Sequence, residues 1–194
     1  MCQECLISFK IRNKENQVKY FDEIVVCSWG IYEGKLRDAI IALKNGEKKL
    51  CKYFSRILVN FWLNELGNYS ASYDDYIVVS VPSHKKRIKE RGYCQTTLIA
   101  QQFAAECKVP FLKEFVVRKK YTAFMNKQLN IQERRLNIYG AFEALKMPEV
   151  KNILVIDDIL TSGSTLCELA RAIYKKNKNV NLIGLTIASG DRFN

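Results

Sequence analysis

The sequence has little or none of several features that mark particular classes of protein. No apolar run approaches the roughly 20 residues of a membrane-spanning helix, and no charged, apolar and small-residue signal segment opens the chain. The seven cysteines are odd in number and follow no regular framework spacing, which argues against a disulfide scaffold. We therefore expect a cytoplasmic protein with no membrane span and with free thiols.

Common nucleotide-binding signatures are also missing, and a different pattern stands in their place. Residues 153–165 contain neither the Gly-Lys-Ser/Thr of a Walker loop nor the G-x-G-x-x-G of a dinucleotide site. They run instead from four apolar β-formers through Asp157 and Asp158 into a turn rich in hydroxyl groups, and then into a segment with helical spacing. Such a strand, loop and helix form the layout of a phosphate-and-ribose site.

The chemistry of this segment supports that interpretation. Gly163 lets backbone approach an anion closely, and the first N–H groups of the following helix favour a phosphate. The two carboxylates can accept hydrogen bonds from a ribose diol and can help to hold a hard cation. The alternative is a plain strand, an Asp turn and a Ser/Thr helix cap. On the first interpretation the phosphate contacts come from Thr161, Ser162, Gly163, Ser164 and Thr165.

Composition and periodicity place the segment in one α/β domain. The chain has 194 residues, 48% of them hydrophobic, which is enough for one well-buried domain without internal repeats. Helices are expected at 36–43, 50–66, 96–107 and 166–174, with strands at 77–81, 115–117, 141–145, 153–156 and 182–188. The strand at 77–81 is taken as the first of the sheet, and 119–135 shows no strong period. Alternating strands and helices predict a parallel sheet flanked by helices.

Net charge points to an anionic partner. Lys and Arg number 31 against 20 Asp and Glu, which gives a formal charge of +11. One small anionic ligand does not need so large an excess, so single-stranded nucleic acid is a second candidate. A basic surface that serves only solubility is the remaining explanation.

Several motifs together resemble one family. Residues 153–165 resemble the 5-phosphoribosyl-1-pyrophosphate (PRPP) loop of type I phosphoribosyltransferases, and 81–95 resembles the V-P-x-H…R…R-G-F-N-Q signature of ComF-type proteins within that fold. Residues 32–44 and the spacing of Gln128, Arg134, Asn137 and 140–142 also match, so the resemblance covers about residues 20–190. The sequence departs from the family pattern at Cys94 for Asn, Tyr93 for Phe and Ser162 for Thr.

The resemblance implies a type I phosphoribosyltransferase fold with a small hood or flexible loop, and roles for particular residues. Asp157 and Asp158 would hold the ribose diol, while Mg²⁺ would bridge pyrophosphate and ribose oxygens during pentosyl transfer. The flexible loop that closes over PRPP would include Arg118, Lys119, Gln128 and Arg134, unless these are plain loop charges. The pyrophosphate would be bound by residues of the segment after the strand at 77–81, which are Pro82, Ser83, His84, Arg87 and Arg91. The alternative is that this segment is a solvated basic loop.

The single histidine and the first cysteines receive smaller roles. His84 is expected to contact phosphate or substrate at most, because displacement at ribose C1 can proceed by charge stabilisation. ComF relatives often carry an N-terminal zinc module, and we interpret residues 1–20 as its remnant and 21–194 as a single domain. Cys2 and Cys5 form the only C-x-x-C pair, so a four-ligand zinc site would need Cys27 or Cys51, and zinc is not expected.

Two functions from different classes follow. One is phosphoribosyl transfer, or PRPP binding without turnover, linked through the ComF resemblance to natural transformation and DNA uptake. The other is a non-catalytic factor that handles single-stranded DNA and uses the pocket for binding or sensing. Competence proteins and a second copy of the chain are further candidate partners on either interpretation. Glutamine-dependent amination is not expected, because the chain has no glutaminase domain.

Overall fold

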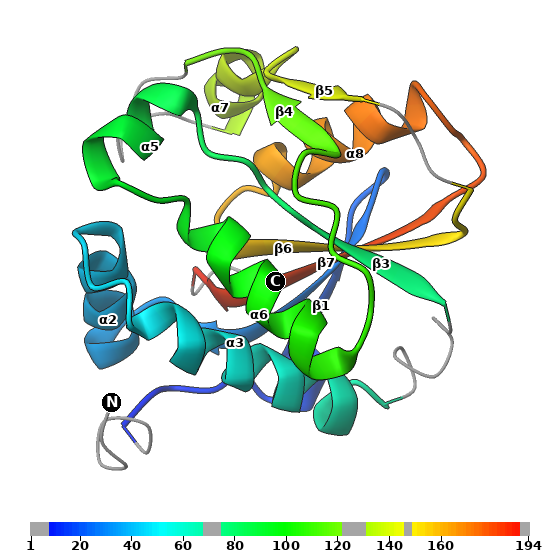
Figure 1. The fold of residues 1–194 in the computed structure, drawn as a ribbon. Helices are drawn as coiled ribbons and strands as arrows, with labels where there is room; N and C mark the ends of the chain where they lie inside the picture. The colour runs from blue at the N-terminus through cyan, green and yellow to red at the C-terminus, as the bar shows by residue number, and fades with distance from the viewer. Residues whose placement is uncertain (1–7, 68–74, 122–130, 146–148, 191–194) are drawn as a thin grey trace.

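The computed structural model describes residues 8–67, 75–121, 131–145 and 149–190, and the fold is built on a five-stranded sheet (Figure 1). The strand order is β1-β2-β7-β6-β3, with β2, β7, β6 and β3 parallel and β1 antiparallel to β2. The strands of this sheet are β1 (Val18–Tyr20), β2 (Val25–Ile31), β3 (Tyr76–Ser80), β6 (Asn152–Leu160) and β7 (Asn181–Ser189). The predicted parallel sheet is confirmed for these four strands, and β1 adds an antiparallel edge to it.

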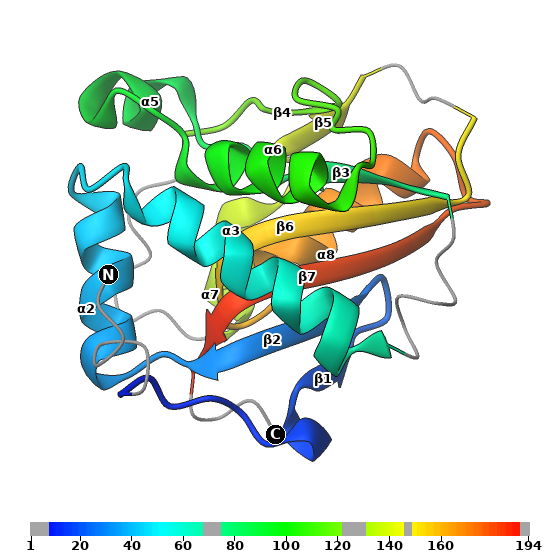
Figure 2. The same cartoon turned by 60° about the horizontal axis from the view of Figure 1, so that its bottom comes forward.

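Helices cover both faces of the sheet (Figure 2). Those on one face include α3 (Leu50–Asn60) and α6 (Gln95–Cys107), while α8 (Ser164–Tyr174) lies on the other. The remaining elements are a 3-10 turn (Lys14–Asn16), α2 (Gly34–Lys44), a π-helical turn (Phe61–Glu65), α5 (Lys85–Arg91), α7 (Ile131–Ile138) and the antiparallel pair β4 (Val116–Arg118) and β5 (Phe142–Ala144). None of the helices in the described ranges is long and apolar enough to cross a membrane.

Strand β6, which pairs with β7 on one side and β3 on the other, shows why its apolar run has no polar gaps. Leu154 and Ile156 belong to the core on the α3 and α6 side, whereas Ile153 and Val155 belong to the core on the α8 side. Successive side chains of a strand point to opposite faces, so a strand covered on both sides needs an apolar residue at every position. The interpretation of 153–156 as a strand buried on both faces is therefore confirmed.

Two expectations about the elements were wrong. The strand at 77–81 is not the first, because β1 and β2 precede it, and β2 carries the buried polar Ser28 within an apolar run. The segment after Pro82, which was interpreted as a basic turn, is mostly the short helix α5. The stretch 119–135 has no strong period, as expected, and α7 nevertheless begins within it. In each case tertiary packing or end capping supplies the order that local periodicity does not show.

Candidate functional site

The two acidic residues of the motif lie in the strand itself. Strand β6 continues through Leu160, and Asp157 stands opposite Thr186 of β7 in the register. Asp157 is 9% exposed and Asp158 is 7% exposed, so both carboxylates are largely removed from bulk water. Burial of two adjacent acids is costly unless partners compensate, and such pairs are typical of functional sites.

Both carboxylates open onto a cavity of about 230 Å³ at the carboxyl ends of β3 and β6. Parallel strands end at the same edge of a sheet, and ligands of open α/β sheets bind there. The cavity is lined by Lys44, Val81, Pro82, Ser83, Arg87, Arg91, Gln95, Thr96, Arg118, Asp157, Asp158, Ile159, Thr161 and Thr165. Segments that are far apart in the sequence thus meet around the acidic pair.

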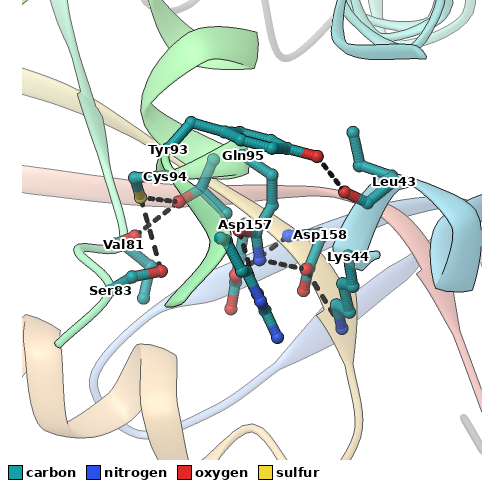
Figure 3. A network of polar contacts seen from close by, with 11 residues as sticks. Leu43, Lys44, Val81, Ser83, Tyr93, Cys94, Gln95, Asp157 and Asp158 are labelled. Atoms are coloured by element: carbon teal, nitrogen blue, oxygen red, sulfur yellow. Dashed lines mark hydrogen bonds and ion pairs between the residues drawn. The ribbon is translucent and has the colours of Figure 1, made fainter. Parts of the chain in front are cut away.

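Asp158 is held as a carboxylate by two partners (Figure 3). Lys44 Nζ lies 3.1 Å from its Oδ2, and Gln95 Nε2 donates a hydrogen bond of 3.0 Å to the same oxygen. Burial alone would raise the pKa of Asp158, but the Lys44 charge and these hydrogen bonds outweigh burial and lower it. Gln95 Oε1 also accepts from Arg91 Nη1 at 3.1 Å, so the amide links the arginine to the carboxylate.

Asp157 has the opposite protonation preference. Burial and the neighbouring Asp158 charge raise its pKa to about 8, although its Oδ1 accepts the backbone N–H of Asp158 at 2.9 Å. The two neighbouring acids therefore differ in protonation: Asp158 is ionised, whereas Asp157 tends to keep its proton. A ligand that offers two hydroxyl donors and a nearby cation would favour ionisation of both.

The loop after β6 has the geometry of an anion cradle. Gly163 adopts φ +77° directly before α8, and the hydroxyls of Ser162 and Ser164 lie 2.8 Å apart. Thr161 and Thr165 line the main cavity, and with Gly163 they also line a small adjoining cavity of about 10 Å³. The first N–H groups of an 11-residue helix point into this region, where the helix dipole favours negative charge.

Gly163→Ala is expected to damage this loop strongly. A Cβ atom at this position would overlap the ring of Phe21, and the left-handed conformation by itself costs a residue with a Cβ about 1–2 kcal/mol. We expect a lower free energy of unfolding in urea titrations. The double variant Phe21→Ala/Gly163→Ala should remove the overlap but keep the conformational cost. Equal stability of Gly163→Ala and the wild type would contradict this account.

The other side of the cavity is basic. Pro82 and Ser83 follow β3 and line the cavity, as do Arg87 and Arg91 of α5 and Arg118 of β4. Burial and the nearby Arg87 charge lower the pKa of Arg118, and Asp157 opposes that shift. Two guanidinium groups that repel each other are well placed to receive a polyanion.

His84 has a structural role in this conformation. It is the N-cap of α5, and its Nδ1 accepts the backbone N–H of Lys86 at 3.1 Å. Its ring lies edge-on to Tyr121, with 5.0 Å between the centroids, and it does not line the cavity. A capping role explains the residue without any contact to a ligand.

The residues expected in a flexible loop separate into different positions. Arg118 lines the cavity, whereas Lys119 pairs with Glu143 of β5 and does not line it. Gln128 lies outside the described residues, and Arg134 belongs to α7, with no side-chain position described. Cys2 and Cys5 also lie outside the described residues, while Cys27 and Cys51 are buried free thiols.

Sequence reasoning assigned no role to Lys44 or Gln95, which are the two partners of Asp158. Lys44 is the last residue of α2, and Gln95 is the first residue of α6. Gln95 lies more than 60 residues before Asp158 in the sequence. Lys44 is the last residue of the family motif at 32–44, and Gln95 is the last residue of the family motif at 81–95. The signal that could have found them was therefore a polar residue at the end of each motif. Only the tertiary contact shows what these residues do.

Comparison with known proteins gives a consistent picture. The family model described as "Phosphoribosyl transferase domain" matches residues 88–188. The chain is 33% identical over 101 residues to "Competence protein F" of Haemophilus influenzae, covering 50% of this chain and 44% of that protein. It is 27% identical over 136 residues to "Competence protein ComFC" of Bacillus subtilis, covering 67% of this chain and 52% of that protein.

Further matches agree with these. "DNA utilization protein YhgH" of Escherichia coli K12 is 30% identical over 99 residues, with 50% of this chain and 43% of that protein covered. The chain thus spans about half the length of the curated relatives it matches. Adenine phosphoribosyltransferase of Leishmania tarentolae aligns over 90% of this chain and 95% of its own at 12% identity, with a TM-score of 0.36 that is too low to carry an argument.

Proposed function

The chain belongs to the phosphoribosyl transferase domain family, and from this premise we propose that the cavity beside Asp157 and Asp158 binds PRPP together with Mg²⁺. One observation carries the proposal: an acidic pair, a phosphate cradle and a basic wall line the same cavity. These three parts correspond to the ribose diol, the 5′-phosphate and the pyrophosphate of one molecule.

Each part of the cavity has a distinct task in this proposal. Asp157 and Asp158 accept hydrogen bonds from the 2′- and 3′-hydroxyls, and the 161–165 loop holds the 5′-phosphate. Arg87 and Arg118 receive the pyrophosphate and stabilise the charge that develops as its bond to C1 weakens. A nitrogen nucleophile then completes phosphoribosyl transfer, if the protein turns over.

The donor set of the cavity fits a Mg²⁺ ion that arrives with its ligand. Mg²⁺ prefers oxygen ligands and keeps much of its shell from water and phosphates. Asp157 supplies a carboxylate, but Asp158 is already paired with Lys44. Most of the metal's ligands would therefore be PRPP oxygens, and the metal would neutralise pyrophosphate charge.

Calorimetric titration of Mg²⁺-PRPP into the wild type and into Asp157→Asn/Asp158→Asn tests the proposal. We expect saturable, Mg²⁺-dependent binding to the wild type, and at least about a hundredfold weaker binding to the variant, because neutral amides replace the two charged acceptors of the diol. Glu15→Gln, an exposed carboxylate on the N-terminal 3-10 turn, is the matched control and should bind normally. Absence of binding to a folded wild-type protein would refute the proposal.

The names of the relatives and the net charge favour a second function, binding of single-stranded DNA in the context of DNA uptake. Lys85, Lys86 and Lys89 of α5 are exposed beside the cavity. We expect binding to fall steeply with salt and to weaken when these lysines are neutralised, but not in Asp157→Asn/Asp158→Asn. Binding by the lysine variant with unchanged affinity and salt slope would assign DNA to another surface.

A further inference from the structure

A second and larger cavity lies behind the Pro82–Ser83 turn. Its volume is about 590 Å³, within the range of small-molecule sites, and its walls come from α5 and α6 on one side and from β4 on the other. The lining residues are Lys48, Pro82, Ser83, Lys85, Ile88, Gly92, Tyr93, Cys94, Thr97, Leu98, Gln101, Lys113, Glu114, Val116, Val117 and Arg118. Asp157, Asp158 and the 161–165 loop do not line it, so this space is separate from the proposed ribose and 5′-phosphate positions.

The lining combines apolar walls with a basic rim. Ile88 and Leu98 come from the helical side, and Val116 and Val117 from β4. The three lysines Lys48, Lys85 and Lys113 are exposed, while Glu114 is the one acidic residue among the lining residues. Apolar walls with a small number of charged groups at the edge favour a ligand that has an apolar body and a negative group.

The two cavities share part of their walls. Pro82, Ser83 and Arg118 line both. Cys94 Sγ lies 3.4 Å from Ser83 Oγ (Figure 3). Thr96 Oγ1 donates a 2.7 Å hydrogen bond to the carbonyl of Val81. A ligand in the second cavity therefore contacts the same turn that the proposed pyrophosphate group would contact from the other side.

We propose that the cavity between α5, α6 and β4 is a nucleotide site, in which the base lies between the apolar walls and the phosphate meets the lysine rim. A base is a flat, largely apolar ring, which suits a space bounded by a helical wall and a strand. A free nucleotide and a unit of a single strand present the same chemistry, and both fit the excess of positive charge. The proposal does not rest on PRPP binding.

Cys94 provides a direct reporter of this cavity. Burial would raise the pKa of its thiol, but hydrogen bonding with Ser83, Thr96 and Thr97 lowers it overall. Burial raises the pKa of Cys27, Cys51 and Cys167 to about 11–12, and that of Cys107 is raised as well. Among the described cysteines, iodoacetamide should therefore alkylate Cys94 fastest, and peptide mass spectrometry can follow that one residue.

The test measures the rate of Cys94 alkylation with dTMP, a short oligodeoxythymidylate, thymidine or inorganic phosphate present. We expect saturating dTMP to slow alkylation at least about tenfold, with little effect of thymidine or phosphate alone, because the site needs both parts of the ligand. Protection by dTMP identifies free nucleotide as sufficient, and protection by the oligonucleotide alone identifies a strand. Absence of protection by both probes overturns the proposal.

Two variants separate this cavity from the proposed PRPP site. Val117→Trp fills the apolar space, and Lys48→Glu/Lys113→Glu reverses charge at the rim, while none of these residues lines the first cavity. Both variants should lose nucleotide protection and keep Mg²⁺-PRPP binding, with circular dichroism to confirm folding. Protection that persists in both folded variants would also overturn the proposal, whatever the outcome of the PRPP titration.

Discussion

Lys44→Met is expected to lower the free energy of unfolding by about 3 kcal/mol at pH 7, because it leaves the Asp158 charge buried without its cation. Lys44 Nζ is the ion-pair partner of Asp158 Oδ2, and only neutral hydrogen-bond donors such as Gln95 would remain. Methionine keeps the length of the side chain, so loss of packing contributes little. Urea titration gives the measurement.

The pH dependence of this loss identifies its cause. The pKa of Asp158 is lowered in the folded protein, so its ionised form contributes stability above the unfolded pKa near 4, and that contribution disappears as pH falls through the folded value. The difference between Lys44→Met and wild type should therefore shrink on acidification. Lys44→Met/Asp158→Asn should recover most of the loss, and Lys35→Met, on the exposed side of α2, should show none. A loss that does not change with pH would point to packing instead.

The parts of the site that could be predicted are those whose geometry is local. An apolar run, two acids, a glycine turn and helical spacing define β6, its loop and α8 almost completely, and β3 with the following Pro82 was recognised in the same way. Parallel neighbours end at one edge of a sheet, so Ser83 and Arg87 reach the same cavity as Asp157 without any further information.

The parts that could not be predicted depend on contacts between distant segments. Lys44 and Gln95 meet at Asp158 only because α2 ends and α6 begins near the same edge of the sheet. Phe21 fixes the space beside Gly163 from the hairpin between β1 and β2, a hairpin that periodicity missed. Cys94 is the N-cap residue of α6, and its side chain makes no capping hydrogen bond. The Asn of the family pattern would be a good N-cap at this position. The capping position can be recognised only once the start of the helix is known.

The affinity for Mg²⁺-PRPP is expected to rise about fivefold between pH 7 and pH 8 and to level off above the pKa of Asp157. Burial and the Asp158 charge raise that pKa to about 8, so at pH 7 the free site mostly carries a proton on Asp157. The proposed ligand needs a carboxylate there, and binding must therefore release the proton. The second phosphate pKa lies near 6, so the ligand itself changes little in this range.

Asp157→Asn separates this cause from others. The variant should bind more weakly at pH 8 and should lose the slope between pH 7 and pH 8. Stability should respond in the opposite sense: the unfolded Asp157 ionises near pH 4 while the folded one keeps its proton to about 8, so the wild type loses unfolding free energy across that interval. Asp157→Asn avoids this loss and should unfold at higher urea than wild type at pH 8. An identical affinity slope in both proteins would assign the proton to a group other than Asp157, and would leave the proposed pairing of an ionised and a protonated acid without support.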